Sequence, residues 1–280
     1  MRKVILLLLL LPLPALAEVY VNQEPPADWA QRDVLRITIL QTGRTDAILV
    51  ECGGEAMLID GGSEAWGPYL REALKVRGLS SIRYFLNTHP HHDHAEGLIY
   101  LMQQGVLPEK LMSPFAADWH DDSYHDQLLT LAWNNGVPFR LVKNGDVYDL
   151  GGAQVHIYRT TQNSGLNSCS AIQLITFGDS RILLCADITG NAQKALMAEL
   201  PEGALTAEII KVPHHGVKAM VDSFLTGVSP ALLMCTNNPG DAPDLARQAE
   251  NRNLPLLYSG AGEIVLETDG TDWYVRQAGE

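Results

Sequence analysis

The sequence predicts an α/β fold in which two β-sheets pack face to face and helices cover their outer surfaces. Short apolar runs bounded by Gly, Asn or Asp, which are typical of strands, follow one another closely near the start of the chain. Further along, such runs mix with segments whose apolar residues recur at helical spacing. This order favours a two-sheet sandwich over a doubly wound parallel sheet, in which strands and helices alternate throughout.

The expected elements follow in chain order from these patterns. Strands are expected at 34–40, 46–52, 56–60, 83–87, 138–142, 153–159, 171–177, 181–186, 207–212, 231–235, 255–258, 263–267 and 272–276. Helices are expected at 67–77, 95–104, 123–134, 190–199, 218–226 and 241–252. The two strands within 171–186 form an expected hairpin, because Gly178-Asp179 is typical of a tight turn.

Residues 1–17 have the layout of a cleavable secretory signal peptide. A basic start precedes an apolar run at 4–11, and Ala15–Ala17 resembles a cleavage site. An uncleaved membrane anchor is the alternative, but Pro12 and Pro14 interrupt the run well short of the roughly 20 apolar residues that a spanning helix needs. We therefore expect cleavage after Ala17 and a periplasmic or secreted protein.

The remaining residues, 18–280, are long enough for one well-buried domain and short for two. No later stretch is apolar enough to span a bilayer, so no integral membrane segment is expected after removal of the signal. The formal net charge of −13 becomes more negative when the basic signal is lost. Such acidity does not favour nucleic acid as a partner, although it leaves a local basic patch open.

A cluster of histidines follows the strand expected to end near Asn87. Zinc prefers imidazole nitrogens and carboxylate oxygens, and a loop after a strand can turn several such side chains toward one point. A solvated polar loop is the alternative explanation. Five potential ligands occur within the seven residues after Asn87: His89, His91, His92, Asp93 and His94.

The run HPHHDH matches H-x-H-x-D-H, the signature of the metallo-β-lactamase superfamily. The resemblance continues in TGRTDAILVECGGEAMLIDGG, in SRILLCADITG and in IIKVPHHG, which follow in the expected order and cover most of residues 36–216. These segments resemble most closely the hydrolase domain of ComEC-type competence proteins and their soluble exported relatives. The resemblance implies an αββα four-layer sandwich with one or two zinc ions, for which Mn²⁺ is an alternative.

The same resemblance assigns roles to individual residues. It implies a first metal held by His89 and His91, a second held by Asp93, His94 and His215, and a bridging Asp187. Asp93 and His214 would act in catalysis, with His214 as a substrate contact or proton donor, although the order of the two adjacent histidines stays open. Asp60 would orient the histidine loop, unless it is a plain turn residue.

One departure from the superfamily narrows the expected function. Glyoxalase-type hydrolases, lactonases and most zinc β-lactamases place a third histidine on the first metal, within a Gly-His context that this chain lacks. ComEC-type relatives carry an Asn/Ser-rich segment instead, which here includes Asn167, Cys169 and Ser170 as candidate supporting or substrate-contacting residues. Cys169 can be a zinc ligand, a disulfide partner of Cys185, or an inert thiol.

We therefore expect a metal-dependent hydrolase of phosphoesters, acting on a small-molecule or cell-envelope ester. A hydrolase of carboxylic esters, lactones or β-lactams is the alternative, and a non-catalytic metal-binding module is a third. A polar loop carrying Trp119, His120, Tyr124 and His125 either forms the rim of the substrate site or is simply solvated.

Overall fold

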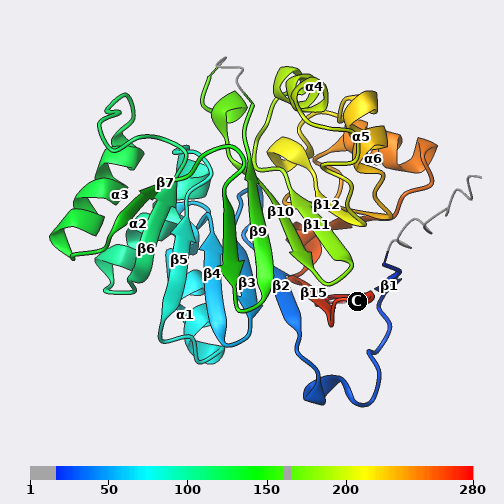
Figure 1. The fold of residues 1–280 in the computed structure, drawn as a ribbon, viewed down its shortest axis with the longest axis horizontal. Helices are drawn as coiled ribbons and strands as arrows, with labels where there is room; N and C mark the ends of the chain where they lie inside the picture. The colour runs from blue at the N-terminus through cyan, green and yellow to red at the C-terminus, as the bar shows by residue number, and fades with distance from the viewer. Residues whose placement is uncertain (1–16, 161–164, 280) are drawn as a thin grey trace, which may run out of the picture.

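The computed structural model describes residues 17–160 and 165–279. Within them, two mixed sheets of nine and seven strands pack face to face, and helices lie outside both (Figure 1). The expected αββα fold is confirmed. The signal peptide predicted at 1–17 lies outside the described residues except for its last position.

The nine-stranded sheet has the order β1-β16-β15-β2-β3-β4-β5-β6-β7. It is antiparallel from β16 to β4, parallel from β4 to β7, and β1 pairs parallel to β16. Its strands are β1 (Val19–Val21), β2 (Leu35–Ile39), β3 (Ile48–Cys52), β4 (Glu55–Ile59), β5 (Ile82–Leu86), β6 (Pro108–Ser113), β7 (Phe139–Leu141), β15 (Ile264–Thr268) and β16 (Trp273–Gln277).

The seven-stranded sheet has the order β14-β13-β12-β11-β10-β9-β8. It is antiparallel from β8 to β11 and parallel from β11 to β14. The hairpin expected at 171–186 is present, with Phe177 opposite Ser180 across the turn. The strands are β8 (Val147–Leu150), β9 (Ala153–Tyr158), β10 (Ile172–Phe177), β11 (Ser180–Leu184), β12 (Ile209–Lys211), β13 (Leu232–Cys235) and β14 (Leu256–Tyr258).

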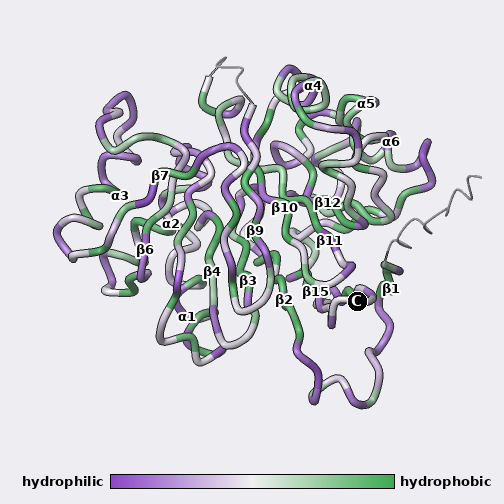
Figure 2. Tube along the Cα trace, viewed as in Figure 1, coloured by the Kyte–Doolittle hydropathy of each residue, from purple (hydrophilic) through white to green (hydrophobic). Residues whose placement is uncertain are grey.

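Three apolar interfaces hold the four layers together. In β3, Val50 packs between the sheets and Leu49 packs against the outer helices, because alternate side chains face opposite sides of a strand. In β11, Leu184 and Leu183 divide in the same way. Hydrophobic residues accordingly run along the central strands (Figure 2). The helices are α1 (Gly67–Val76), α2 (His92–Gln103) and α3 (Ser123–Asn134) on the first sheet, and α4 (Gly190–Glu199), α5 (Asp222–Val228) and α6 (Pro243–Asn251) on the second.

All of the strands and helices expected from the sequence are present, and three strands were not expected. β1 has only three residues, β6 begins with Pro108 and two charged residues, and β8 is a mostly exposed edge strand. Each of them therefore lacks a clear apolar or alternating pattern. In the described part of the chain, none of the helices has the length and apolar character needed to cross a bilayer.

Candidate metal centre

The histidine cluster lies where β5 gives way to α2. His89 and His91 are in the connecting loop, whereas Asp93 and His94 are in the first turn of α2, which begins at His92. The expectation of a loop up to position 94 was therefore wrong. A helix start suits Asp93, because the positive end of the helix dipole favours a carboxylate. The side chain of His92 is 65% exposed, so it stands apart from the buried ligands.

Two groups of potential ligands share His94 and lie beside Asp187, which follows β11. His89, His94 and Asp187 form one group, and Asp93, His94 and His215 form another; within each group the ligand atoms lie within 4.8 Å of one another. Oδ2 of Asp187 is 3.4 Å from Nε2 of His94, 3.4 Å from Nε2 of His215 and 3.9 Å from Nε2 of His89. One carboxylate oxygen thus lies close to histidines of both groups, where the bridging ligand was predicted.

His91 adds a nitrogen beside the first group. Its Nδ1 is 3.0 Å from Nε2 of His89, although His91 is a member of neither of these two ligand groups. His91 is half-buried and His89 is fully buried, so His91 lies at the open edge of the centre. The structure therefore brings together all six predicted metal ligands, with His91 at the edge.

The polar atoms at the centre fit a cation. Nε2 of His94, Nε2 of His215 and Oδ1 of Asp187 are buried and have no hydrogen-bond partner among the described residues. Buried polar atoms are rarely left unpaired, because each loses its hydration without compensation. Burial opposes charge on His215, but Asp187 and Asp46 outweigh it and raise the pKa of this imidazole to about 10. Carboxylates that favour positive charge at this point of the fold would also favour a bound divalent metal ion.

Asp60 holds the first turn of α2 and the preceding loop. Its Oδ2 accepts a hydrogen bond of 2.7 Å from Nδ1 of His94 and one of 2.6 Å from the Thr88 hydroxyl, while Oδ1 accepts from the Thr88 amide and from the Asn87 side chain. The Nδ1 contact directs Nε2 of His94 toward Asp187. This geometry fits the orienting role predicted for Asp60 rather than that of a plain turn residue.

Glycines allow α2 to approach the end of β4 closely enough for this contact. A Cβ atom on Gly97 would lie 1.8 Å from the carbonyl oxygen of Gly61. The Gly61 amide donates to the His94 carbonyl, and the Gly97 amide donates to the Gly62 carbonyl. These backbone contacts fix the helix against the segment that carries Asp60.

A second carboxylate, Asp46, supports His215, and sequence reasoning did not single it out. Oδ1 of Asp46 is 3.3 Å from Nδ1 of His215 and accepts a hydrogen bond of 2.6 Å from the Thr236 hydroxyl, whose oxygen is 3.0 Å from the same ring nitrogen. Its other oxygen pairs with the ammonium group of Lys211, and both residues are fully buried. Lys211 also donates to the Ala186 carbonyl, next to Asp187.

His214 is the more accessible of the two adjacent histidines. Its Nε2 is 3.7 Å from Oδ2 of Asp187, its side chain is 39% exposed, and the Asn167 amide lies 3.4 Å from the same nitrogen. Oδ1 of Asn167 and the hydroxyl of Ser170 are buried without a hydrogen-bond partner among the described residues. His215 is therefore the buried histidine of the pair and His214 the accessible one, and the assignment of His215 as the ligand stays a prediction.

The backbone is strained around this centre. Seven non-glycine residues of the described chain have positive φ, and four of them, Asp60, Ala186, His214 and His215, bear ligands or adjoin them. Each such residue costs on the order of 1 kcal/mol or more, and strain of this kind tends to gather at functional sites. The strained backbone at these four residues thus lowers the stability of the fold and fixes the direction of their side chains.

The segment near Cys169 differs in part from expectation. Cys185 is a buried free thiol, so the disulfide considered between Cys169 and Cys185 is not formed. Cys169 is partly buried and belongs to none of the ligand groups. It lines a cavity of about 660 Å³ together with Trp119. Trp119 thus lies at a cavity rim, whereas His125 is buried and bonded to the Ala116 carbonyl, and His120 is exposed and bonded to Asp126.

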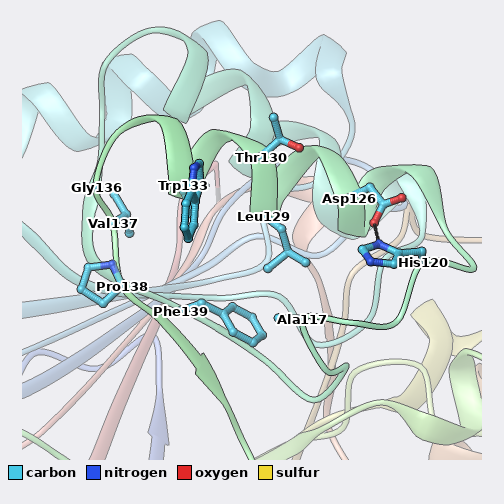
Figure 3. Close-up of a pocket in the computed structure, with 11 residues that line it drawn as sticks. Ala117, His120, Asp126, Leu129, Thr130, Trp133, Gly136, Val137, Pro138 and Phe139 are labelled. Carbon is cyan, nitrogen blue, oxygen red and sulfur yellow. Dashed lines mark hydrogen bonds and ion pairs between the residues drawn. The ribbon is translucent and has the colours of Figure 1, made fainter.

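A larger hollow, of about 900 Å³, lies between α3 and β7 (Figure 3). Leu129, Trp133, Val137 and Phe139 make it largely apolar, and its acidic residue Asp126 is bonded to His120. None of the predicted metal ligands lines it. It is therefore separate from the candidate metal centre.

The fold and the site together define a class: an αββα sandwich with a candidate one- or two-metal site at the ends of its central strands. The chain belongs to the metallo-β-lactamase superfamily, whose family model matches residues 40–225. Members of this superfamily are mostly metal-dependent hydrolases. No curated protein sequence matches the chain. The closer resemblance to ComEC-type proteins therefore stays a prediction.

Solved structures with the same fold are distant in sequence. The metallo-β-lactamase fold protein YhfI from Bacillus subtilis is 15% identical, with a TM-score of 0.55 over 85% of this chain and 100% of that one. A putative metal-dependent hydrolase from Parabacteroides distasonis is 13% identical, with a TM-score of 0.51 over 81% and 93%. CmlA, a diiron β-hydroxylase from Streptomyces venezuelae, is 14% identical, with a TM-score of 0.54 over 81% and 52%. These likenesses show the fold and leave the metal and the substrate open.

Proposed function

We propose that this protein is an exported hydrolase that uses one or two divalent metal ions, zinc first and manganese as the alternative, to cleave phosphoesters. The observation that carries the proposal is the position of Asp187, whose Oδ2 is 3.4 Å from the ring nitrogens of both His94 and His215 and faces His89 at 3.9 Å. Export rests on the signal-like sequence at 1–17.

The residues would divide between two sites that share Asp187. His89 and His91 would hold the first ion, and Asp93, His94 and His215 would hold the second. When bound, such ions supply Lewis acidity, which makes a water molecule acidic near neutral pH and neutralises the charge that develops at phosphorus. Asp60 and Asp46 would fix the orientation of His94 and His215 through the ring nitrogens that face away from Asp187.

Two residues are suited to act on the substrate. Asp93 is 19% exposed at its side chain, so it can face the attacking water and orient it or accept its proton. His214 is 39% exposed and is positioned by Asn167, so it can contact the phosphoryl group or protonate the leaving oxygen. Both residues keep an open face toward solvent, whereas His94 and His215 do not.

A phosphoester is favoured over a carboxylic ester or β-lactam because polar, uncharged residues replace the third histidine that many relatives place on the first metal. These residues are Asn167 and Ser170, and each has a buried oxygen without a hydrogen-bond partner in the described chain. Without a third histidine, the first metal would keep one more coordination position open for an oxygen of an anionic substrate. Two ions that share a carboxylate also suit in-line displacement at phosphorus.

The test combines zinc analysis with hydrolysis of bis-p-nitrophenyl phosphate and nitrocefin by the mature protein. We expect bound zinc, turnover of the phosphodiester and loss of both in Asp93→Ala and His94→Ala. Turnover of nitrocefin alone would instead favour the β-lactam or ester alternative. Tight zinc binding without turnover of any ester would favour a non-catalytic metal-binding module.

A further inference from the structure

A cavity of about 660 Å³ opens next to the candidate metal centre and has no part in the function proposed so far. We call it the cationic cleft and define it by Phe115, Trp119, Lys143, Arg159, Leu166 and Cys169, which all line it. Leu166 precedes the short turn Asn167–Cys169, and Cys169 is its last residue. Leu166, which lines the cleft, is followed in the chain by Asn167, whose amide contacts His214. The cleft therefore lies next to the accessible histidine of the candidate metal centre.

Arg159 is the central charge of this cleft. Its Nε donates to the Cys169 carbonyl at 3.2 Å and its Nη1 donates to the Pro114 carbonyl at 2.8 Å, so the guanidinium is fixed. Among the described residues, its Nη2 has no hydrogen-bond partner. No described carboxylate lies within ion-pair distance of this guanidinium, whereas Arg36 and Arg77 each pair with a glutamate. The group is partly buried. A guanidinium held partly out of water without a counter-ion is poised to bind an anion.

Lys143 adds a second cation to the same cleft. It is exposed, and its ammonium group makes no ion pair with the described carboxylates. Asp121, which is exposed at the rim, is the acidic residue of the lining, so the cleft has a net positive charge in a strongly acidic chain. An anionic ligand would therefore be attracted here more than to the rest of the surface.

Aromatic rings line the same cleft. The ring centroids of Phe115 and Trp119 are 4.6 Å apart, with an angle of 37° between the planes, and Arg159 lies 5.9 Å from the Phe115 centroid. The buried ring of His125 supports Trp119 from α3 at 5.4 Å. Trp119 itself is only partly buried, so part of its surface is available to a planar ligand.

We propose that the cationic cleft binds the part of the substrate beyond the scissile phosphoester, and that this part combines a second anionic group with a planar ring, as in a nucleotide. Arg159 and Lys143 would hold the anionic group, and Trp119 would stack on the ring. The proposal rests on the proposed function, because the metal centre would cleave the phosphoester that this cleft positions. It names a small nucleotide rather than a nucleic acid, since the chain as a whole is strongly acidic.

The test measures binding of α,β-methylene-ADP to the zinc-loaded mature protein by calorimetry, with methylenediphosphonate and adenosine as partial ligands. We expect Arg159→Met to weaken binding of the full analogue by roughly ten- to a hundredfold, which is typical for loss of a charged hydrogen bond. Arg159→Lys should fall between, because it keeps the charge and loses the planar fork. Trp119→Ala should weaken the analogue and adenosine, and leave methylenediphosphonate unchanged.

Arg247→Met is the matched control, since it removes the same charge from an exposed position on α6, outside the cleft. Because Arg159 also bonds two carbonyls, its variants are compared by thermal unfolding; if they unfold, Lys143→Met and Trp119→Ala carry the test. Unchanged binding in those variants, with phosphodiester hydrolysis intact, would overturn the cleft and leave the proposed function standing. Variant-sensitive binding in a protein that hydrolyses no phosphoester would instead overturn the proposed function.

Discussion

Asp46 holds His215 through the ring nitrogen opposite to the one that faces Asp187: its Oδ1 is 3.3 Å from Nδ1 of His215. The same carboxylate pairs with the ammonium group of Lys211, and all three residues are buried. His94 has the equivalent support from Asp60 at 2.7 Å. The two imidazoles closest to Asp187 are thus each fixed by a carboxylate behind them.

Replacing Asp60 by Asn is therefore expected to weaken zinc binding by about 10- to 100-fold, as loss of a carboxylate behind a metal-bound histidine commonly does. Asparagine keeps the size of the side chain but cannot accept two strong hydrogen bonds at the Oδ2 position. Competition with a chromophoric chelator measures the zinc affinity directly. Asp241→Asn, on an exposed loop, is the control, and equal affinity in both variants would remove the orienting role.

Lys211→Met is expected to destabilise the fold by about 3–5 kcal/mol, because it leaves the buried Asp46 carboxylate without its counter-ion. Urea unfolding of the chelator-treated protein measures this cost. The double variant Asp46→Asn, Lys211→Met should be more stable than Lys211→Met alone, since no buried charge is then unpaired. A double variant that is less stable than the single one would contradict the coupling of these two residues.

Gly97→Ala is expected to cost about 1–3 kcal/mol, which is typical of an added buried methyl group without space. The new Cβ atom would lie 1.8 Å from the Gly61 carbonyl oxygen, so α2 must move away from Asp60. Urea unfolding measures the loss, and zinc affinity should fall with it. Gly190→Ala is the matched control at the start of α4, where the added atom would meet Val221 at an ordinary 3.4 Å; similar losses at both positions would contradict the close approach.

Cys185 is expected to react with an alkylating agent after unfolding, without prior reduction. Burial raises the pKa of its thiol well above the ordinary value in the folded protein, which disfavours the reactive thiolate, so protection before unfolding is also expected. Mass spectrometry of peptides from the exported protein identifies the label. A Cys185 peptide that is labelled only after reduction would show that a disulfide forms during export.

Much of this architecture was predictable because its signals are local. The thirteen strands expected from apolar runs are all present. The run from His89 to His94 predicts a metal site from its composition of histidines and an aspartate alone. The strands that the sequence did not predict lack such a pattern; for example, β6 begins with Pro108, and β8 lies at a sheet edge. The start of α2 was misplaced because a ligand-rich segment resembles a loop, whereas the acidic residue in its first turn favours a helix.

The support of His215 was not predictable in the same way. Asp46 and Lys211 stand 165 positions apart, and their pairing depends on the two sheets meeting at one edge. A signal did exist, because Lys211 interrupts the apolar strand between Ile210 and Val212, and a lysine is rarely buried without a partner. The cationic cleft likewise joins residues from three separate loops, so no single segment indicates it.

The central claim is that His89, His94, His215 and Asp187 converge on bound metal ions. Anomalous X-ray diffraction at the zinc absorption edge, from crystals grown with zinc, tests it most directly. We predict one or two anomalous peaks within about 2.0–2.2 Å of the Asp187 carboxylate and of these imidazole nitrogens. Zinc bound elsewhere on the chain, with no peak beside Asp187, would contradict the account.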